Sequence, residues 1–114
     1  MATDRTDVLQ GTLEMLVLRT LSLEPMHGWG LAQRIDMMSG KVFEIQQGTL
    51  YPALQRMKRR GWVRSQWQQT ENNRRARYYS ITSLGRKELE KARKQWARTS
   101  AAVDGILQWE QGGV

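Results

Sequence analysis

Apolar residues in the first half of the chain recur every three or four positions, the spacing that gathers them on one face of a helix. Three helices are expected: over 11–23, between His27 and Gly40, and over 47–60. Pro25 follows the first helix and Gly61 the third, and both residue types commonly terminate helices. The positions expected to be buried are Leu13, Leu16, Val17, Leu21, Leu31, Ile35, Met38, Leu50, Leu54 and Met57.

Two shorter features belong to the same half of the chain. The apolar side chains of 41–45 predict a brief extended segment at the edge of a small sheet. In the third helix, Thr49 as the N-terminal cap would place Pro52 in the first turn, where backbone amides lack helical partners in any case.

After Gly61 the pattern changes from a helical period to the alternation of a strand. Val63, Ser65 and Trp67 alternate with their neighbours, and 75–81 is a second extended run rich in strand-favouring tyrosine and isoleucine. A polar turn joins the two runs. The sequence therefore predicts a hairpin whose tip carries Arg74, Arg75 and Arg77.

A last helix is expected from a cap at Thr82 or Ser83 to about Gln108. Its apolar positions step alternately by three and four residues, which is a heptad-like seam. A narrow seam that includes a tryptophan needs a partner to cover it, so these residues are predicted to form a dimer interface: Leu89, Ala92, Trp96, Thr99, Val103 and Ile106.

The order of three helices, a two-stranded wing and a final helix is that of a winged helix-turn-helix. We therefore expect a mainly α protein with a small β-hairpin, extended by a long C-terminal dimerisation helix. The predicted division is a DNA-binding domain over 1–81, the dimerisation helix over 82–110 and a frayed tail over 111–114.

Composition narrows the function classes. The 114 residues include no cysteine and one histidine, which excludes thiolate and His-cluster metal sites. No catalytic constellation or phosphate-binding glycine loop is recognisable, so we expect neither an enzyme nor a cofactor. There is no membrane-length apolar run, and the first residues carry acids rather than a signal core, so the protein is expected to be cytoplasmic.

The positive charge is concentrated in one part of the chain. The net charge is +7, and 56–98 holds fourteen basic residues against three acidic ones. Such a basic surface is the electrostatic footprint of a polyanion. On the third helix, the face turned away from the core offers side chains that can read bases in a major groove: Gln47, Thr49, Gln55, Arg56 and Arg59. The hairpin arginines are expected on phosphates or in the minor groove.

Several stretches together resemble the PadR family of bacterial transcriptional regulators, in its short form with a single C-terminal helix. They span about 10–110. The run 48–57 is specific in combination with the run 72–79. The stretches are Gln10-Gly11-Thr12-Leu13, Met26-His27-Gly28-Trp29-Gly30-Leu31, the run 48–57 that begins Gly48-Thr49-Leu50-Tyr51-Pro52, the run 72–79 that contains Arg77-Tyr78-Tyr79, and Ile81-Thr82-Ser83-Leu84-Gly85.

The resemblance implies a homodimer that binds an inverted repeat in double-stranded DNA, usually as a repressor. It places base contacts at Thr49, Tyr51 and the following polar face, and wing contacts at the hairpin arginines. Trp29 stands where the family most often has a phosphate-contacting tyrosine. Trp96 stands where some members bind flat aromatic compounds, which implies a planar aromatic effector; an interface anchor without a ligand is the alternative. His27, near the start of a helix, is expected to be structural.

Two other functions stay open from the residues alone. A winged helix can bind RNA, or its third helix can be covered by a partner protein. A steep dependence of binding on salt would favour a nucleic acid over a protein partner.

Overall fold

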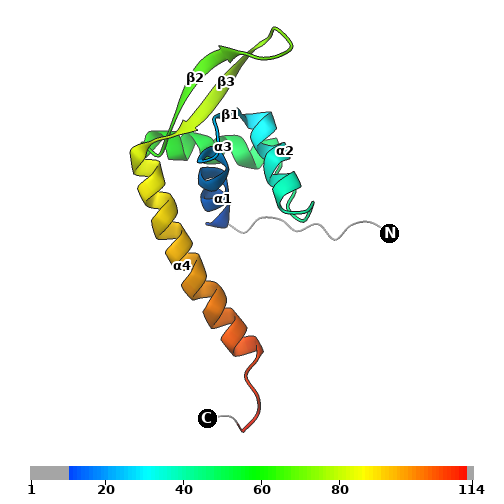
Figure 1. The fold of residues 1–114 in the computed structure, drawn as a ribbon, viewed down its shortest axis with the longest axis vertical. Coiled ribbons are helices and arrows are strands. Elements are labelled where there is room, and N and C mark those ends of the chain that lie inside the picture. The colour runs from blue at the N-terminus through cyan, green and yellow to red at the C-terminus, as the bar shows by residue number, and fades with distance from the viewer. Residues whose placement is uncertain (1–10, 113–114) are drawn as a thin grey trace, which may run out of the picture.

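The computed structural model describes residues 11–112. Gln10 of the first motif stretch, the rest of the N-terminal part of the predicted 1–81 domain, and the last two residues of the predicted frayed tail lie outside this range. The elements are α1 (Thr12–Leu21), β1 (Met26–His27), α2 (Gly28–Met38), α3 (Gln47–Arg59), β2 (Val63–Gln69), β3 (Arg75–Ile81) and α4 (Ser83–Leu107). Figure 1 shows the β2–β3 hairpin rising above α1, α2 and α3, while α4 runs away from them on the opposite side. The predicted fold class is confirmed.

The wing contains the short strand β1 in addition to the predicted hairpin of β2 and β3. The three strands form an antiparallel sheet in the order β1-β3-β2, and β1 pairs Met26 with Tyr79 and His27 with Tyr78. The segment 41–45 follows α2 and is not a strand of this sheet, although Phe43 within it forms an isolated β-bridge. Gly40 and Lys41, with φ of 65° and 66°, then turn the chain toward α3.

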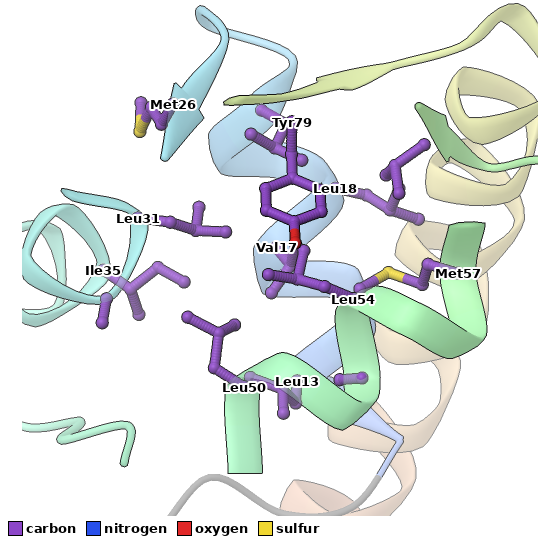
Figure 2. Packing of buried hydrophobic residues seen from close by; sticks show 14 of the residues in the cluster. Leu13, Val17, Leu18, Met26, Leu31, Ile35, Leu50, Leu54, Met57 and Tyr79 are labelled. Atoms are coloured by element: carbon purple, nitrogen blue, oxygen red, sulfur yellow. The ribbon is translucent and has the colours of Figure 1, made fainter. Parts of the chain in front are cut away.

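The core lies where α1, α2 and α3 meet under the sheet, as Figure 2 shows. Most predicted core positions are buried there. Met38 is an error of the prediction: it borders an open hollow beside α1 and is 46% exposed. On α1, Leu18 is buried more fully than the predicted Leu16, which packs at the edge of the core.

α3 begins earlier than a Thr49 cap would allow. Gln46 is the capping residue, and the amides of Thr49 and Leu50 both donate to its carbonyl at 2.9 Å. Pro52 therefore lies beyond the first turn, where it withholds the amide that would bond the exposed Gly48 carbonyl. Gly61, with φ of 81°, ends the helix as predicted.

α4 is anchored at its start and packs beside α1 as far as Trp96. The Thr82 hydroxyl donates to the Gly61 carbonyl at 2.5 Å and accepts from the Gly85 amide at 3.0 Å, so Thr82 is the predicted cap. Gly85 and Leu89 are the buried residues of α4. Beyond Trp96 the helix leaves the body (Figure 1).

No helix in the described part of the chain is long and apolar enough to cross a membrane. Within 11–112 no three His, Cys, Asp or Glu side chains are grouped closely enough to hold a metal ion.

Candidate nucleic-acid interface

A groove of about 440 Å³ lies between the start of α2, one flank of α3 and the wing. It brings together half of the predicted DNA-contacting residues, which come from three separate stretches of sequence: Trp29, Tyr51, Gln55, Arg75 and Arg77. His27 and Trp67 also line it. We call this the wing groove.

The start of α2 is fixed by a histidine cap. The Gly30 amide donates to Nδ1 of His27 at 3.0 Å, which requires that nitrogen to be unprotonated. The imidazole stacks on Trp29 at 6.3 Å between centroids and meets Tyr78 edge-on at 5.4 Å. The expected structural position of His27 is therefore seen. Trp29 stays 60% exposed at the mouth of the groove.

Tyr51 lies across the first residue of α2. A Cβ on Gly28 would stand 2.7 Å from the Tyr51 hydroxyl, so only glycine allows this approach. Beneath, burial raises the pKa of Tyr79 above 10.0, Tyr51 adds to the rise and Arg77 opposes it. Tyr79 is thus a neutral, buried floor to the groove at physiological pH, and Tyr51 is held over it with its ring half in solvent.

The arginines of the wing are organised by a tryptophan. The guanidinium carbons of Arg75 and Arg77 lie 5.4 and 4.7 Å from the centre of the Trp67 ring, and Arg77 donates to the Ser65 hydroxyl at 2.9 Å. Both arginines are thus partly pre-positioned by cation–π contact. Trp67 was predicted to lie on a strand but not to belong to the site; the strand register sets it directly opposite Arg77. Arg74 is exposed at the turn.

The predicted DNA-reading face of α3 is divided between two flanks. Tyr51 and Gln55 face the wing groove, and Arg59 is exposed between the flanks. Thr49 and Arg56 border a second hollow on the side of α1. There the Arg56 Nε and the Arg60 Nη1 lie 3.6 and 3.4 Å from Oε2 of Glu14, a residue that the sequence analysis did not consider. Gln47 borders Trp29 in a shallower hollow beside α2.

The seam of α4 runs from buried to exposed. Leu89 packs against the core and Ala92 is half-buried, whereas Trp96, Thr99, Val103 and Ile106 are exposed on this chain. Trp96 also borders an apolar hollow of about 280 Å³ with Met15, Leu16 and Leu89. From Trp96 to Ile106 the seam is therefore a mainly apolar stripe that no other part of residues 11–112 covers.

Comparison with known proteins gives one consistent family. The model of the PadR-like family of transcriptional regulators matches residues 17–91. A PadR-like regulator of Bacillus cereus is 27% identical, with 90% of this chain and 97% of that chain covered and a TM-score of 0.77. A PadR family regulator of Eggerthella lenta is 30% identical, covering 89% and 86%, also at 0.77. A regulator of Clostridium thermocellum, 23% identical over 87% and 96%, shares the fold at a TM-score of 0.80.

Proposed function

The chain belongs to the PadR-like family of transcriptional regulators, and from this membership we propose that it is a repressor that binds an inverted-repeat operator as a homodimer. The membership makes the protein a DNA-binding regulator rather than an enzyme. Its promoter, its mode of assembly and the direction of regulation are the parts that we propose.

The observation that carries the proposal is the wing groove. One face of the molecule presents a helix flank with a tyrosine and a glutamine, a capped helix start with an exposed tryptophan, and two arginines stacked on Trp67. We infer that α3 enters the major groove with Tyr51, Gln55 and Arg59 toward base edges. Gln47, Thr49 and Arg56 then flank the contact, and Trp29 faces a phosphate.

The wing serves the neighbouring backbone. Arg74, Arg75 and Arg77 project from the hairpin, and guanidinium groups bind phosphates or a narrow minor groove. Because most of these contacts ignore sequence, they supply affinity, while α3 supplies discrimination.

The exposed seam of α4 supports the homodimer. We propose that two copies pair through Trp96, Thr99, Val103 and Ile106, with Leu89 and Ala92 at the end nearest the body. A two-fold axis there presents two copies of α3 to successive major grooves, roughly 34 Å apart. The chain is thus proposed to work as a DNA-binding unit, 1–81, and a dimerisation helix, 82–110.

Two substitutions separate base reading from backbone binding. On the best site selected from genomic fragments, Gln55→Ala should cost about 1–3 kcal/mol and relax the preference at one position. Arg75→Ala should weaken binding to every duplex alike and flatten the plot of log affinity against log salt by about one unit. Fluorescence anisotropy at several salt concentrations measures both.

Lys94→Ala is the matched control, because it removes one charge from α4 on the side away from the seam. It should leave both properties near wild type. If footprinting finds no genomic site better than random duplex, the operator proposal is wrong. Preference for structured RNA at equal salt, or weak salt dependence, would favour the RNA-binding or protein-binding alternatives.

A small-molecule effector is favoured by the apolar hollow beside Trp96. We propose that a planar aromatic compound stacks on this indole, and that titration with flat cationic dyes or phenolic acids quenches tryptophan fluorescence. The protein has five tryptophans, so the difference from Trp96→Ala is the measurement. Saturable quenching that is unchanged in that variant would exclude Trp96.

A further inference from the structure

The corner between α1 and α3 holds a carboxylate shared by two arginines. Oε2 of Glu14 lies 3.6 Å from the Arg56 Nε and 3.4 Å from the Arg60 Nη1. Arg60 also makes a cation–π contact, since its guanidinium carbon lies 5.0 Å from the centre of the Trp62 ring. Glu14, in the first turn of α1, therefore faces two of the four positively charged side chains on α3 and its C-terminal cap residue.

The burial of these groups is unequal. The Glu14 side chain is 21% exposed, whereas those of Arg56 and Arg60 are 41% and 50% exposed. The carboxylate is thus partly shielded from water while both guanidinium groups keep access to solvent and to an approaching anion. The three side chains border an open hollow of about 630 Å³, and Glu14 is the only acid among its described lining residues.

The other cations of the helix are not paired in this way. Lys58 and Arg59 form no ion pair with an acid in the part of the chain that the structure describes. In the wing, Arg75 and Arg77 contact an aromatic ring, which leaves their charge uncompensated. Among the described residues of α3 and the wing, carboxylate compensation is therefore confined to the α1 flank of α3.

We propose that Glu14 is a specificity-determining residue, which restrains Arg56 and Arg60 and so limits the binding of DNA irrespective of its sequence. Sequence-independent affinity comes almost entirely from neutralised phosphates. An arginine held by a carboxylate must give up or share that pair to bind a phosphate, so it contributes less. Operator binding also uses base contacts from the flank of α3 that faces the wing groove. The restraint on Arg56 and Arg60 therefore costs operator binding a smaller fraction of its affinity. The inference rests on the proposed entry of α3 into the major groove.

Glu14→Gln tests this, because it keeps the size of the side chain and removes the charge. With a random-sequence duplex at about 0.15 M salt, its affinity should rise about five- to tenfold. The salt slope should steepen by about one to two units as one or two guanidinium groups gain phosphates. The ratio of operator to random-duplex affinity should fall several-fold.

Glu90→Gln is the matched control. It makes the same change in net charge on α4, where Glu90 is 63% exposed and its pair with Arg93 is long at 3.9 Å. We expect a change below about twofold, since a distant exposed charge is largely screened. Equal gains in both variants, or an unchanged affinity ratio, would overturn the proposal.

Two further variants separate a folding effect from the proposed one. In an Arg56→Gln, Arg60→Gln background, Glu14→Gln should change DNA affinity no more than Glu90→Gln does; a gain that persists there refutes the role of these arginines. Glu14→Asp withdraws the carboxylate but keeps its charge, and should shift the ratio in the same direction by less. If thermal unfolding shows that Glu14→Gln is not folded, the operator to random-duplex affinity ratio of Glu14→Asp tests the proposal instead. A wild-type protein that binds neither duplex would refute the proposed function as well, whereas normal binding with no effect at Glu14 refutes this inference alone.

Discussion

Gly85→Ala should lower the free energy of unfolding by about 3 kcal/mol, because the added methyl group has no space. A Cβ there would stand 2.1 Å from the Trp62 carbonyl oxygen and 2.8 Å from Cγ1 of Ile81. The first obstacle is backbone, which cannot rotate aside as a side chain can. The start of α4 would have to move off the sheet, and the Thr82 cap and the burial of Leu89 would be disturbed with it. Urea unfolding followed by circular dichroism measures the loss.

The same helix contains its own control. A methyl group added at Gly105 would meet nothing within 4 Å in the described part of the chain, so Gly105→Ala should stabilise the helix by about 0.5–1 kcal/mol through the loss of backbone freedom in the unfolded chain. Both variants should be compared at one protein concentration, since assembly changes apparent stability. A Gly85→Ala protein as stable as wild type would show that α4 does not pack against Trp62 as described.

Val103→Glu should convert the proposed dimer into a monomer and lower the affinity for an inverted repeat by about a hundredfold or more. A carboxylate in the middle of an apolar interface loses its hydration without a partner. The repeat is then bound by two independent copies, and the gain from linking two half-sites is lost. Sedimentation measures the assembly, and titration of a full repeat and of a half-site measures the affinity.

Ala101→Glu adds the same charge to the opposite side of α4 and should leave the protein dimeric. Affinity for the half-site should be nearly the same in both variants and in wild type, because the wing groove lies at the other end of the molecule. A Val103→Glu protein that stays dimeric, or a wild type that is monomeric, would refute the seam as the interface.

The sequence predicted the elements that carry a long, clear period. The second strand over 75–81 and the Thr82 start of α4 agree with the structure, because alternation and capping are local properties. β1 was not predicted, since its two residues are too few to show alternation and become a strand only by pairing with β3. Met38 follows the helical period of α2, but periodicity does not indicate how completely the neighbouring elements cover that face.

The candidate site was predicted as a set of residue types but not as an arrangement. The helical period puts Gln55 and Arg56 on one outward face. Only the packing of α1 decides that Arg56 turns toward Glu14 while Gln55 borders the wing groove. Trp67 was likewise placed on a strand, and its role depends on the register that sets it opposite Arg77. Relations between distant segments were therefore the part that local patterns could not supply.

The short strand β1 has a consequence for the entropy of binding. It joins the wing to the first residue of α2 through backbone pairing. His27 caps α2, and its ring also contacts Trp29 and Tyr78. The wing and the start of α2 thus form one preorganised scaffold on two sides of the wing groove. Docking on a duplex then freezes little backbone, and the ordering cost falls mainly on long side chains, each about 0.5–1.5 kcal/mol. The ordering cost of the Arg77 side chain is reduced further, because contacts with Trp67 and Ser65 already restrain it before it binds a phosphate.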